Sequence, residues 1–355
     1  MKIKIVGSGL IGTSLALAWQ KSGHEIELSD RSAENLELAI NLLGGANLHH
    51  ADPEVIVIAT PVHQILGALH TEFEANPEAT FIDIGGLKTN LLLEVARIPG
   101  LNARFCSSHP MAGREVNGPE SARGDLFTGR PWILTPSAQT EPRSLSIARE
   151  LALEAGASIF ELAPEEHDAA VALVSHLPQA ISSLLGVVIG QGESEYLGLA
   201  GQGLRDVSRL AASDGGLWSD LLISNRSAVL PLLEEYAAAL DGLREALEES
   251  DSERLIALLG EGSEGRSKIP GKHGGIARNY HQLPIVIDDK PGQLARIFLE
   301  CAQANVNIED LTMEHSPGQQ TGLITLSLSE SDALKLHAHL TSLGWLAHLP
   351  RANAQ

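Results

Sequence analysis

The chain has 355 residues, of which 43% are hydrophobic, and it carries 25 basic against 45 acidic residues, a formal net charge of −20. This length predicts more than one domain, and the acidic balance argues against a general nucleic-acid-binding or anionic-membrane surface. The two cysteines, Cys106 and Cys301, lie far apart in sequence and give no metal-site spacing, which suits a reducing cytoplasm. Because no long uncharged apolar run occurs, no transmembrane helix is predicted.

The first predicted elements are an apolar strand at residues 2–6, a glycine-rich turn and a helix over residues 13–21. The turn has the G-x-G-x-x-G pattern and consists of Gly7, Ser8, Gly9, Leu10, Ile11 and Gly12. Gly7 permits the tight turn, Gly9 lets a pyrophosphate approach the backbone, and Gly12 lets the helix pack closely on the strand. Free N–H groups at the start of the helix then face the phosphates. The pattern predicts a Rossmann-type dinucleotide-binding domain of the α/β class, with the glycines, Leu10 and Ile11 at the cofactor.

The second predicted strand, residues 25–29, ends at Asp30 and Arg31. Asp30 is placed to bond a ribose 2′-hydroxyl and to repel a 2′-phosphate, which favours NAD over NADP. Two alternatives stay open, because Arg31 could accommodate a phosphate and Asp30 could be a helix N-cap. We predict NAD as the cofactor, with both residues at its ribose.

Further apolar strands continue the α/β rhythm. Residues 55–59 are apolar enough for a central parallel strand, and Thr60 and Pro61 end it at the edge where a cofactor would lie. Three more strands are predicted, at residues 81–84, 132–134 and 158–162. A helix between the last two ends at Gly156. This first domain is predicted to comprise residues 1–164.

A histidine motif, Ser-Ser-His-Pro-Met-Ala-Gly-Arg-Glu, occupies residues 107–115. The apolar residues 103–106 predict a short buried strand, so His109 should lie just past the C-terminal end of a strand, where open α/β sheets bind ligands. A histidine there can accept or donate a proton near neutral pH. The alternative is a loop histidine bonded to a backbone carbonyl.

The residues from 165 to 277 predict an all-helical second domain. Pro178 should kink or break one of its helices. Residues 218–246 form one or two long helices with apolar positions at helical spacing, and a dimer core is the natural partner for that surface. Residues 261–277 are rich in Gly, Ser, Lys and Pro, and predict a mobile connection.

The third domain, residues 278–355, has the βαββαβ order of a ferredoxin-like fold. Its strands are predicted at residues 283–287, 305–313, 322–328 and 345–349. Its helices are predicted after Gly292, ending at Gln303, and over residues 332–343.

The run His109-Pro110-Met111-Ala112-Gly113 resembles the signature of the prephenate and arogenate dehydrogenases, enzymes of tyrosine biosynthesis. Matching segments extend from Lys2 to about Asn225. The resemblance implies a cytoplasmic homodimer that uses NAD to convert prephenate to 4-hydroxyphenylpyruvate by oxidative decarboxylation.

The resemblance also implies roles for individual residues. His109 matches the catalytic histidine, and Arg209 matches the arginine that binds the substrate side-chain carboxylate. Ser175 and His176 match a motif near nicotinamide and substrate, and are predicted to be catalytic. From the residues alone, Arg209 could equally pair with Asp206 along one helix, and His176 could bond within the helical bundle.

Two positions depart from the family pattern. Gly86 stands where many members have a serine that positions the cofactor and the catalytic histidine, and Gln179 stands where many have a second histidine. Both are predicted to lie at the substrate, and a cation is needed there to replace the lost histidine. Lys88 is the first candidate for it, and the others are Arg266, Lys268 and Lys272.

The C-terminal part resembles an ACT domain, a module that binds small amino acids between paired copies. The resemblance lies in Pro291-Gly292-Gln293-Leu294 and Asn305-Val306-Asn307-Ile308. It implies allosteric feedback by L-tyrosine at a site formed by Asp288, Pro291, Gly292, Asn305, Asn307 and Ile308. The alternative is a structural dimer module without a ligand.

Other functions remain open on the sequence. An arogenate dehydrogenase would yield tyrosine directly. A hydroxyacid dehydrogenase with a catalytic lysine is kept open by Lys88, and a non-catalytic amino-acid sensor by Gly86.

Overall fold

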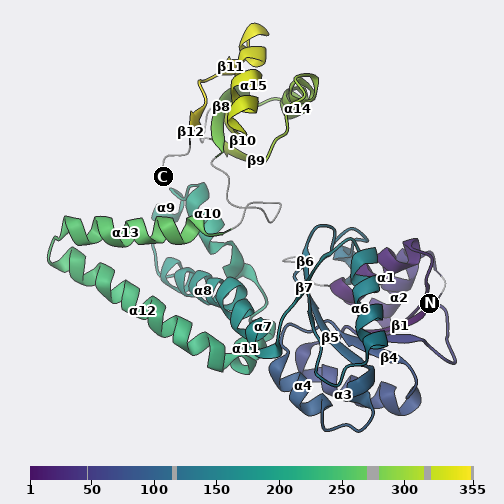
Figure 1. Cartoon of the computed structure of the whole chain (residues 1–355). Helices are drawn as coiled ribbons and strands as arrows, with labels where there is room; N and C mark the ends of the chain where they lie inside the picture. Colours follow the sequence, from purple (N-terminus) through teal and green to yellow (C-terminus); the bar gives the residue numbers. More distant parts are fainter. Residues whose placement is uncertain (46, 114–117, 270–279, 316–320, 353–355) are drawn as a thin grey trace. The chain divides into compact units, whose positions relative to one another are not determined.

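The computed structural model describes residues 1–45, 47–113, 118–269, 280–315 and 321–352 (Figure 1). The chain divides into two compact units, Met1–Ala238 and Ala239–Gln355. The predicted residues Lys272 and 270–277 of the connection lie outside the described residues.

Seven strands of the described residues form one sheet in the first unit, in the order β2-β1-β3-β4-β5-β6-β7. The strands are β1 (Lys2–Val6), β2 (Glu25–Ser29), β3 (Val55–Ile58), β4 (Thr80–Asp83), β5 (Phe105–Pro110), β6 (Pro131–Thr135) and β7 (Ser158–Glu161). Neighbours are parallel except β5 and β6, which are antiparallel. The order reverses between β1 and β3, which is the switch point where such sheets bind ligands.

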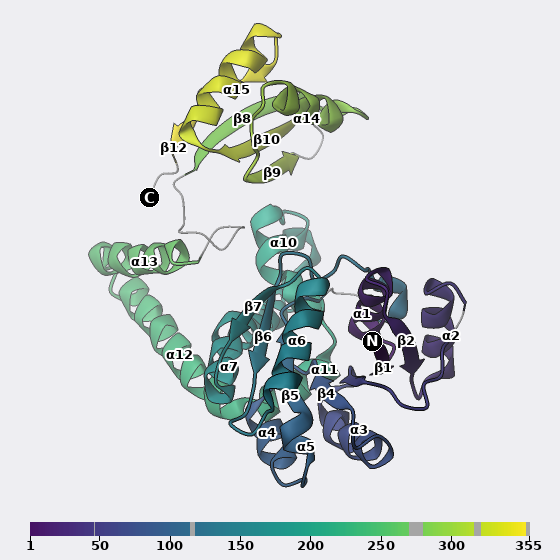
Figure 2. The same cartoon turned by 45° about the vertical axis from the view of Figure 1, so that its right-hand side comes forward.

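Both faces of this sheet are buried by helices. On β3, Val55 and Val57 face one core, and Ile56 and Ile58 face the other. The first core includes α1 (Leu10–Lys21), α2 (Ala33–Leu42) and α6 (Pro142–Glu154), and the second includes α3 (Val62–Ala75), α4 (Thr89–Val95) and α5 (Leu101–Arg104). Figure 2 shows α6 lying across β5 and β6. Burial on both faces explains why the central strands are apolar throughout.

The prediction around the histidine motif is partly wrong. Ala103 and Arg104 belong to the short helix α5, and β5 continues through His109 to Pro110. The antiparallel partner β6 extends the ladder, since His109 pairs with Ile133, whereas the pairing with β4 stops at Ser107. His109 therefore lies beyond the end of β4, although it is still inside a strand.

The helical part of the first unit begins with a long continuous stretch. It consists of α7 (Pro164–Val171), a π-helical turn η2 (Ala172–His176) and α8 (Leu177–Ile189). Pro178 lies in the first turn of α8, and the helical stretch is not broken there. The wider π-helical turn before it accommodates the missing N–H and the proline ring, which a regular helix interior would not.

This stretch, Pro164–Ile189, is long and apolar enough to cross a membrane, judged by length and composition alone. Only 22% of its most apolar window is buried. Its exposed apolar side chains are Leu173, Val174, Leu184, Val187 and Val188. They leave an apolar surface that needs a cover.

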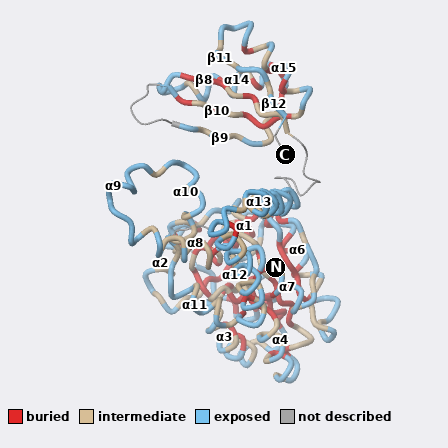
Figure 3. Tube along the Cα trace, turned by 90° about the vertical axis from the view of Figure 1, so that its left-hand side faces the viewer, coloured by how far each residue is buried: buried red, intermediate tan, exposed pale blue. Residues whose placement is uncertain are grey.

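The remaining helices are α9 (Ser194–Leu197), α10 (Gln202–Ser208), η3 (Arg209–Ala212), α11 (Gly215–Ser224), α12 (Arg226–Glu248) and α13 (Ser252–Ser267). The long helices expected at residues 218–246 are thus α11 and α12. The connection predicted at residues 261–277 is wrong in its first part, because α13 runs to Ser267. Figure 3 shows exposed residues along most of α9, α10 and α13.

The C-terminal part of the second unit is an antiparallel sheet with two helices. The elements are β8 (His281–Asp288), α14 (Gln293–Gln303), β9 (Asp310–His315), β10 (Thr321–Leu328), α15 (Glu330–Ser342), β11 (Leu346–Ala347) and β12 (Arg351–Ala352). The strand order is β11-β8-β10-β9, with β12 also on β8. The predicted strand at residues 305–313 begins only at Asp310, because Asn305 adopts a left-handed turn conformation at φ 48°.

Candidate active site

The carboxyl ends of β1, β3, β4 and β5 bring the predicted site residues of the first domain to one edge of the sheet. Gly7 follows β1, Thr60 follows β3, Gly86 follows β4, and His109 lies near the end of β5. These segments are distant in sequence, and only the parallel pairing of the strands brings them together.

The glycine turn has the shape that a pyrophosphate requires. Gly7 has φ 109°, and a Cβ there would lie 2.5 Å from the Ala59 carbonyl oxygen. A Cβ on Gly12 would lie 1.9 Å from the Gly7 carbonyl oxygen, so only glycine fits at either position. At Gly9, in contrast, a Cβ would meet nothing within 4 Å among the described residues. The open side of the turn, with Leu10 starting α1, therefore leaves room for a phosphate at a helix N-terminus.

Asp30 stands beside this turn. Its Oδ2 accepts hydrogen bonds from the backbone N and the hydroxyl of Ser8, at 2.6 and 2.9 Å. The N-cap of α2 is Ser32, whose hydroxyl accepts from the Asn35 backbone N, so the alternative role of Asp30 as that cap does not apply. Arg31 is exposed next to it.

A further feature of the cofactor edge is the hydroxyl group of Thr60. Its Oγ1 is buried and has no hydrogen-bond partner among the described residues, whereas the adjacent Pro61 is exposed. Buried hydroxyls in folded proteins are nearly always paired, so this atom is suited to a bound polar group.

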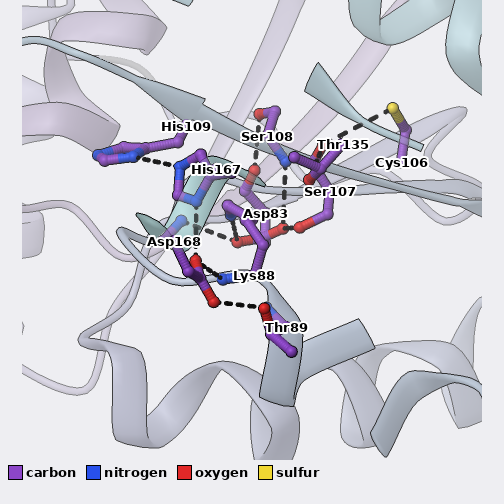
Figure 4. A network of polar contacts seen from close by, with 11 residues as sticks. Asp83, Lys88, Thr89, Cys106, Ser107, Ser108, His109, Thr135, His167 and Asp168 are labelled. Atoms are coloured by element: carbon purple, nitrogen blue, oxygen red, sulfur yellow. Dashed lines mark hydrogen bonds and ion pairs between the residues drawn. The ribbon is translucent and has the colours of Figure 1, made fainter. Parts of the chain in front are cut away.

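Three side chains form a line of hydrogen bonds behind this edge (Figure 4). His109 Nδ1 lies 2.9 Å from His167 Nε2, and His167 Nδ1 lies 2.8 Å from Asp168 Oδ1. The Asp168 carboxylate also accepts from the backbone N–H groups of Lys88 and Thr89, both at 2.9 Å. The line joins β5 to α7 and the start of α4.

The line also determines which nitrogen of each ring carries hydrogen. Burial raises the pKa of Asp168, but the hydrogen bonds from His167, Thr89 and Lys88 outweigh it and hold that pKa below its ordinary value. The ionised carboxylate therefore accepts from His167 Nδ1–H, and when His167 carries that single proton its Nε2 accepts from His109 Nδ1–H. His109 Nε2 remains as an acceptor, and it lies 3.9 Å from the position of a Cβ on Gly86.

His109 is held in its neutral form. Burial of the ring, followed by the positive charge of Lys88 and the nearby His167 and His176, lowers the pKa of His109 well below 6.5. The residue as a whole is half-buried.

The structure places Lys88, the first candidate for a substrate cation, in the interior of the protein. It is fully buried, and its ammonium donates to Asp83 Oδ2 at 2.6 Å. The same carboxylate accepts from the Gly85 backbone N and the Ser107 hydroxyl, at 2.8 and 2.6 Å. Burial lowers the pKa of Lys88 and the charge of Asp83 opposes that shift. Lys88 and Asp83 therefore form a buried ion pair near His109.

The helical side contributes a second histidine. His176 is buried, lies 3.1 Å through Nδ1 from Asn225 Nδ2, and packs edge-on against Trp218 at 5.9 Å between centroids. Asn225 also donates to the Asp168 backbone carbonyl at 2.8 Å, which ties this histidine to the line behind His109. Ser175 precedes it, half-buried on the same π-helical turn.

Gln179 and Arg209 lie on neighbouring elements. Gln179 is buried, and its Nε2 donates to the Leu210 carbonyl oxygen at 2.8 Å, next to Arg209 at the exposed start of η3. Of the remaining candidate cations, Arg266 lies in the last turn of α13 and Lys268 follows that helix, both in the second unit.

Sequence reasoning missed three members of the site, namely His167, Asp168 and Asp83. The sequence alone assigns no role to the first two. Their signal was a polar pair, His-Asp, on a helix whose next residues are apolar.

The sheet, the glycine turn and the edge residues define a class of protein, the dinucleotide-dependent dehydrogenases with a Rossmann-type domain. A family model described as "Prephenate dehydrogenase, nucleotide-binding domain" matches residues 15–161, and "Prephenate dehydrogenase, dimerization domain" matches residues 163–261. The chain belongs to the prephenate dehydrogenase family, and the match agrees with the predicted NAD cofactor.

Individual relatives agree with this assignment. The probable prephenate dehydrogenase NovF of Streptomyces niveus is 30% identical over 97% of this chain and 98% of its own length. The crystal structure of A. aeolicus prephenate dehydrogenase with hydroxyphenyl propionate and NAD+ has a TM-score of 0.69 and 27% identity, covering 76% of this chain and 99% of that one. Synechocystis arogenate dehydrogenase has a TM-score of 0.64 and 29% identity, covering the same shares of the two chains.

Changing Gly86 to serine should leave kcat unchanged or raise it. A Cβ at this position would contact Leu221 Cδ2 at 3.4 Å and His109 at 3.9 Å, which is ordinary van der Waals spacing, and the new hydroxyl could bond His109 Nε2. Steady-state kinetics of the variant provide the measurement, with Gly86→Ala as the control that adds bulk without a hydroxyl. A collapse of activity in a folded Gly86→Ser protein would mean that the space is needed by cofactor or substrate.

Proposed function

We propose that this chain catalyses the NAD-dependent oxidative decarboxylation of prephenate to 4-hydroxyphenylpyruvate. The observation that carries the proposal is the line from Asp168 through His167, which leaves His109 Nε2 as an acceptor at the cofactor edge. Such an atom can accept the hydrogen of a substrate hydroxyl. The family and the hydroxyphenyl propionate bound to the A. aeolicus enzyme support a substrate of this kind.

Bound NAD would supply the hydride acceptor, and the glycine turn, Asp30, Arg31, Thr60 and Pro61 would hold it. His109 Nε2 takes the proton of the 4-hydroxyl as hydride leaves C4 of the ring. The carboxylate on the ring then departs as CO2, and its bonding electrons make the ring aromatic. The oxygen then takes the proton back from His109 and becomes the hydroxyl of a phenol, so His109 ends the reaction in its starting form.

Arg209 is proposed to hold the side-chain carboxylate of the substrate, since a guanidinium can grip a carboxylate through two parallel hydrogen bonds. Ser175 and His176 are proposed to contact the reacting groups. Gln179 stands at the substrate without a charge, and its buried Oε1 has no hydrogen-bond partner among the described residues.

Arogenate is the second candidate substrate, supported by the similarity to the Synechocystis enzyme. A hydroxyacid dehydrogenase with a catalytic lysine is disfavoured, because the ammonium of Lys88 is buried against Asp83. One assay separates these functions and the non-catalytic sensor. Purified protein is mixed with NAD and prephenate, arogenate or a simple hydroxyacid, and the absorbance of reduced nicotinamide is followed. Absence of reduction with both prephenate and arogenate would overturn the proposal.

NAD should be used in preference to NADP, because the Asp30 carboxylate lies where a 2′-phosphate would enter. Replacing Asp30 with asparagine removes the charge at constant shape and should improve the kcat/KM for NADP relative to NAD by roughly tenfold, which corresponds to about 1.4 kcal/mol. Glu34→Gln, in the first turn of α2, is the matched control. If the wild-type enzyme uses NADP as well as NAD, the placement of Asp30 at the ribose is wrong.

We propose three domains, comprising residues 1–164, 165–277 and 278–355, and a cytoplasmic homodimer. The match of residues 163–261 to a dimerization domain supports the second domain and the homodimer. A partner subunit, rather than a membrane, would then cover the apolar surface of Pro164–Ile189.

The C-terminal sheet is proposed to be a ferredoxin-like ACT domain that binds L-tyrosine. Its element order and antiparallel strand order support this. Asp288, Pro291 and Gly292 precede α14, whereas Asn305, Asn307 and Ile308 follow it. A helix of 11 residues is about 16 Å long, so both segments can share a ligand only if two copies pair.

Tyrosine should therefore bind the full-length protein and lower its turnover. Isothermal calorimetry gives the binding, and a chain truncated after Gly275 should still oxidise substrate while no longer responding to tyrosine. Coupling between such sites is typically about 1–3 kcal/mol, roughly a 5- to 150-fold change in affinity. If millimolar tyrosine, phenylalanine and tryptophan all fail to bind, the unit is a structural dimer module.

A further inference from the structure

His167 is a wholly buried histidine for which the reaction described so far has no chemical use. It stands between a base and a carboxylate, 2.9 Å from His109 Nδ1 and 2.8 Å from Asp168 Oδ1. A purely packing role would not require both ring nitrogens to be engaged at hydrogen-bond distance.

The surroundings of His109 are poor for holding a positive charge. Burial of the ring is the largest cause of the lowered pKa of His109, and the positive charge of the buried Lys88 ammonium lowers it further. Asp83 offsets Lys88 but is itself bonded to that ammonium. An imidazolium at His109 would therefore be poorly solvated near the Lys88 ammonium, and its Nδ1 meets another imidazole rather than a carboxylate.

The surroundings of His167 are the opposite. Its Nδ1–H points at the Asp168 carboxylate, which the backbone N–H groups of Lys88 and Thr89 hold in its ionised form. A buried imidazolium is stable when such a counter-ion is paired with it. Asp168 also lines a polar cavity of about 140 Å³ with Thr89, Asn90, Glu165 and Asn225, which has room for water to solvate the carboxylate.

We propose that His167 stores the substrate proton during turnover, with Asp168 as its counter-ion. This rests on the proposed function. As the substrate O–H bond breaks, a new N–H bond forms at His109 Nε2, and the His109 Nδ1–H proton moves to His167 Nε2. The positive charge then lies on His167. After CO2 has left, both protons move back and the phenol oxygen regains its hydrogen, so no proton and no electron is gained or lost by the two histidines.

The first test is His167→Gln. The amide oxygen of glutamine can still accept from His109 Nδ1–H and so can position His109, but it cannot hold a proton. We expect kcat to fall on the order of 10²-fold, the lower end of acid–base assistance, with NAD affinity unchanged. His70→Gln, an exposed position on α3, is the matched control. A folded His167→Gln enzyme with wild-type kcat would reduce His167 to a positioning residue and overturn the proposal.

The second test needs no variant at the buried position. In mixtures of H2O and D2O, the rate of the wild-type enzyme should depend on the deuterium fraction through two moving protons, giving a curved plot. A straight line, which indicates one proton, would overturn the storage step. Nitrogen-15 NMR of the free protein should also show His109 protonated at Nδ1 only. A wild-type enzyme that reduces no NAD with prephenate would instead refute the proposed function, while the NMR result would still test the hydrogen-bond line.

Discussion

Replacing His109 with asparagine should leave NAD binding intact and lower kcat by about 10²–10⁴-fold, the usual contribution of acid–base assistance. Asparagine retains the approximate shape of the ring and can still meet His167, but it cannot take the hydroxyl proton. Calorimetric titration with NAD and steady-state kinetics with prephenate measure the two effects separately.

His70→Asn on α3 is the matched control, because His70 is exposed and pairs with the exposed Glu74, four residues along the same helix. A His109→Asn enzyme that keeps activity within a few-fold of the wild type would remove His109 from the mechanism.

The pH dependence of the wild-type enzyme carries the same argument. His109 must be neutral to act, and its pKa lies well below 6.5 because its ring is buried near Lys88. The value of kcat/KM should therefore stay level as the pH falls through 6.5, and decline only at lower pH as the ring becomes protonated. An acid limb centred at or above 6.5 would contradict the neutral, desolvated state of the ring.

Replacing Lys88 with methionine should destabilise the first unit by about 3–5 kcal/mol, since it leaves the buried Asp83 carboxylate without its counter-ion. Both side chains of this pair are fully buried. Urea denaturation of the variant and the wild type gives the difference in the free energy of unfolding.

Arg97→Met is the matched control just beyond the other end of α4, because the Arg97–Glu94 pair is exposed and should contribute about 1 kcal/mol or less. The double variant Asp83→Asn with Lys88→Met should recover part of the loss, since it removes the unpaired charge. If Lys88→Met is as stable as Arg97→Met, the buried Lys88–Asp83 pair does not stabilise the first unit.

Most of the nucleotide-binding fold could be predicted from the sequence, because its signals are local. The apolar residues of β3 predict a buried strand, and the glycine pattern at Gly7 predicts a tight turn, without knowledge of distant residues. His167 and Lys88 could not be assigned in this way. A lysine is ordinarily exposed, and a His-Asp pair near the start of a helix is ordinarily in contact with water. The partner of His167, which is His109, and the partner of Lys88, which is Asp83, become evident only once the strands are paired.

The π-helical turn before His176 has a consequence for the direction in which side chains point. In a regular α-helix, His167 and His176, nine residues apart, would project in directions about 180° different. One inserted residue makes the separation count as eight, which reduces the difference to about 80°. Asn225 can then reach both the His176 ring and the Asp168 carbonyl. The extra residue thus turns His176 toward the side of the helical stretch that carries His167.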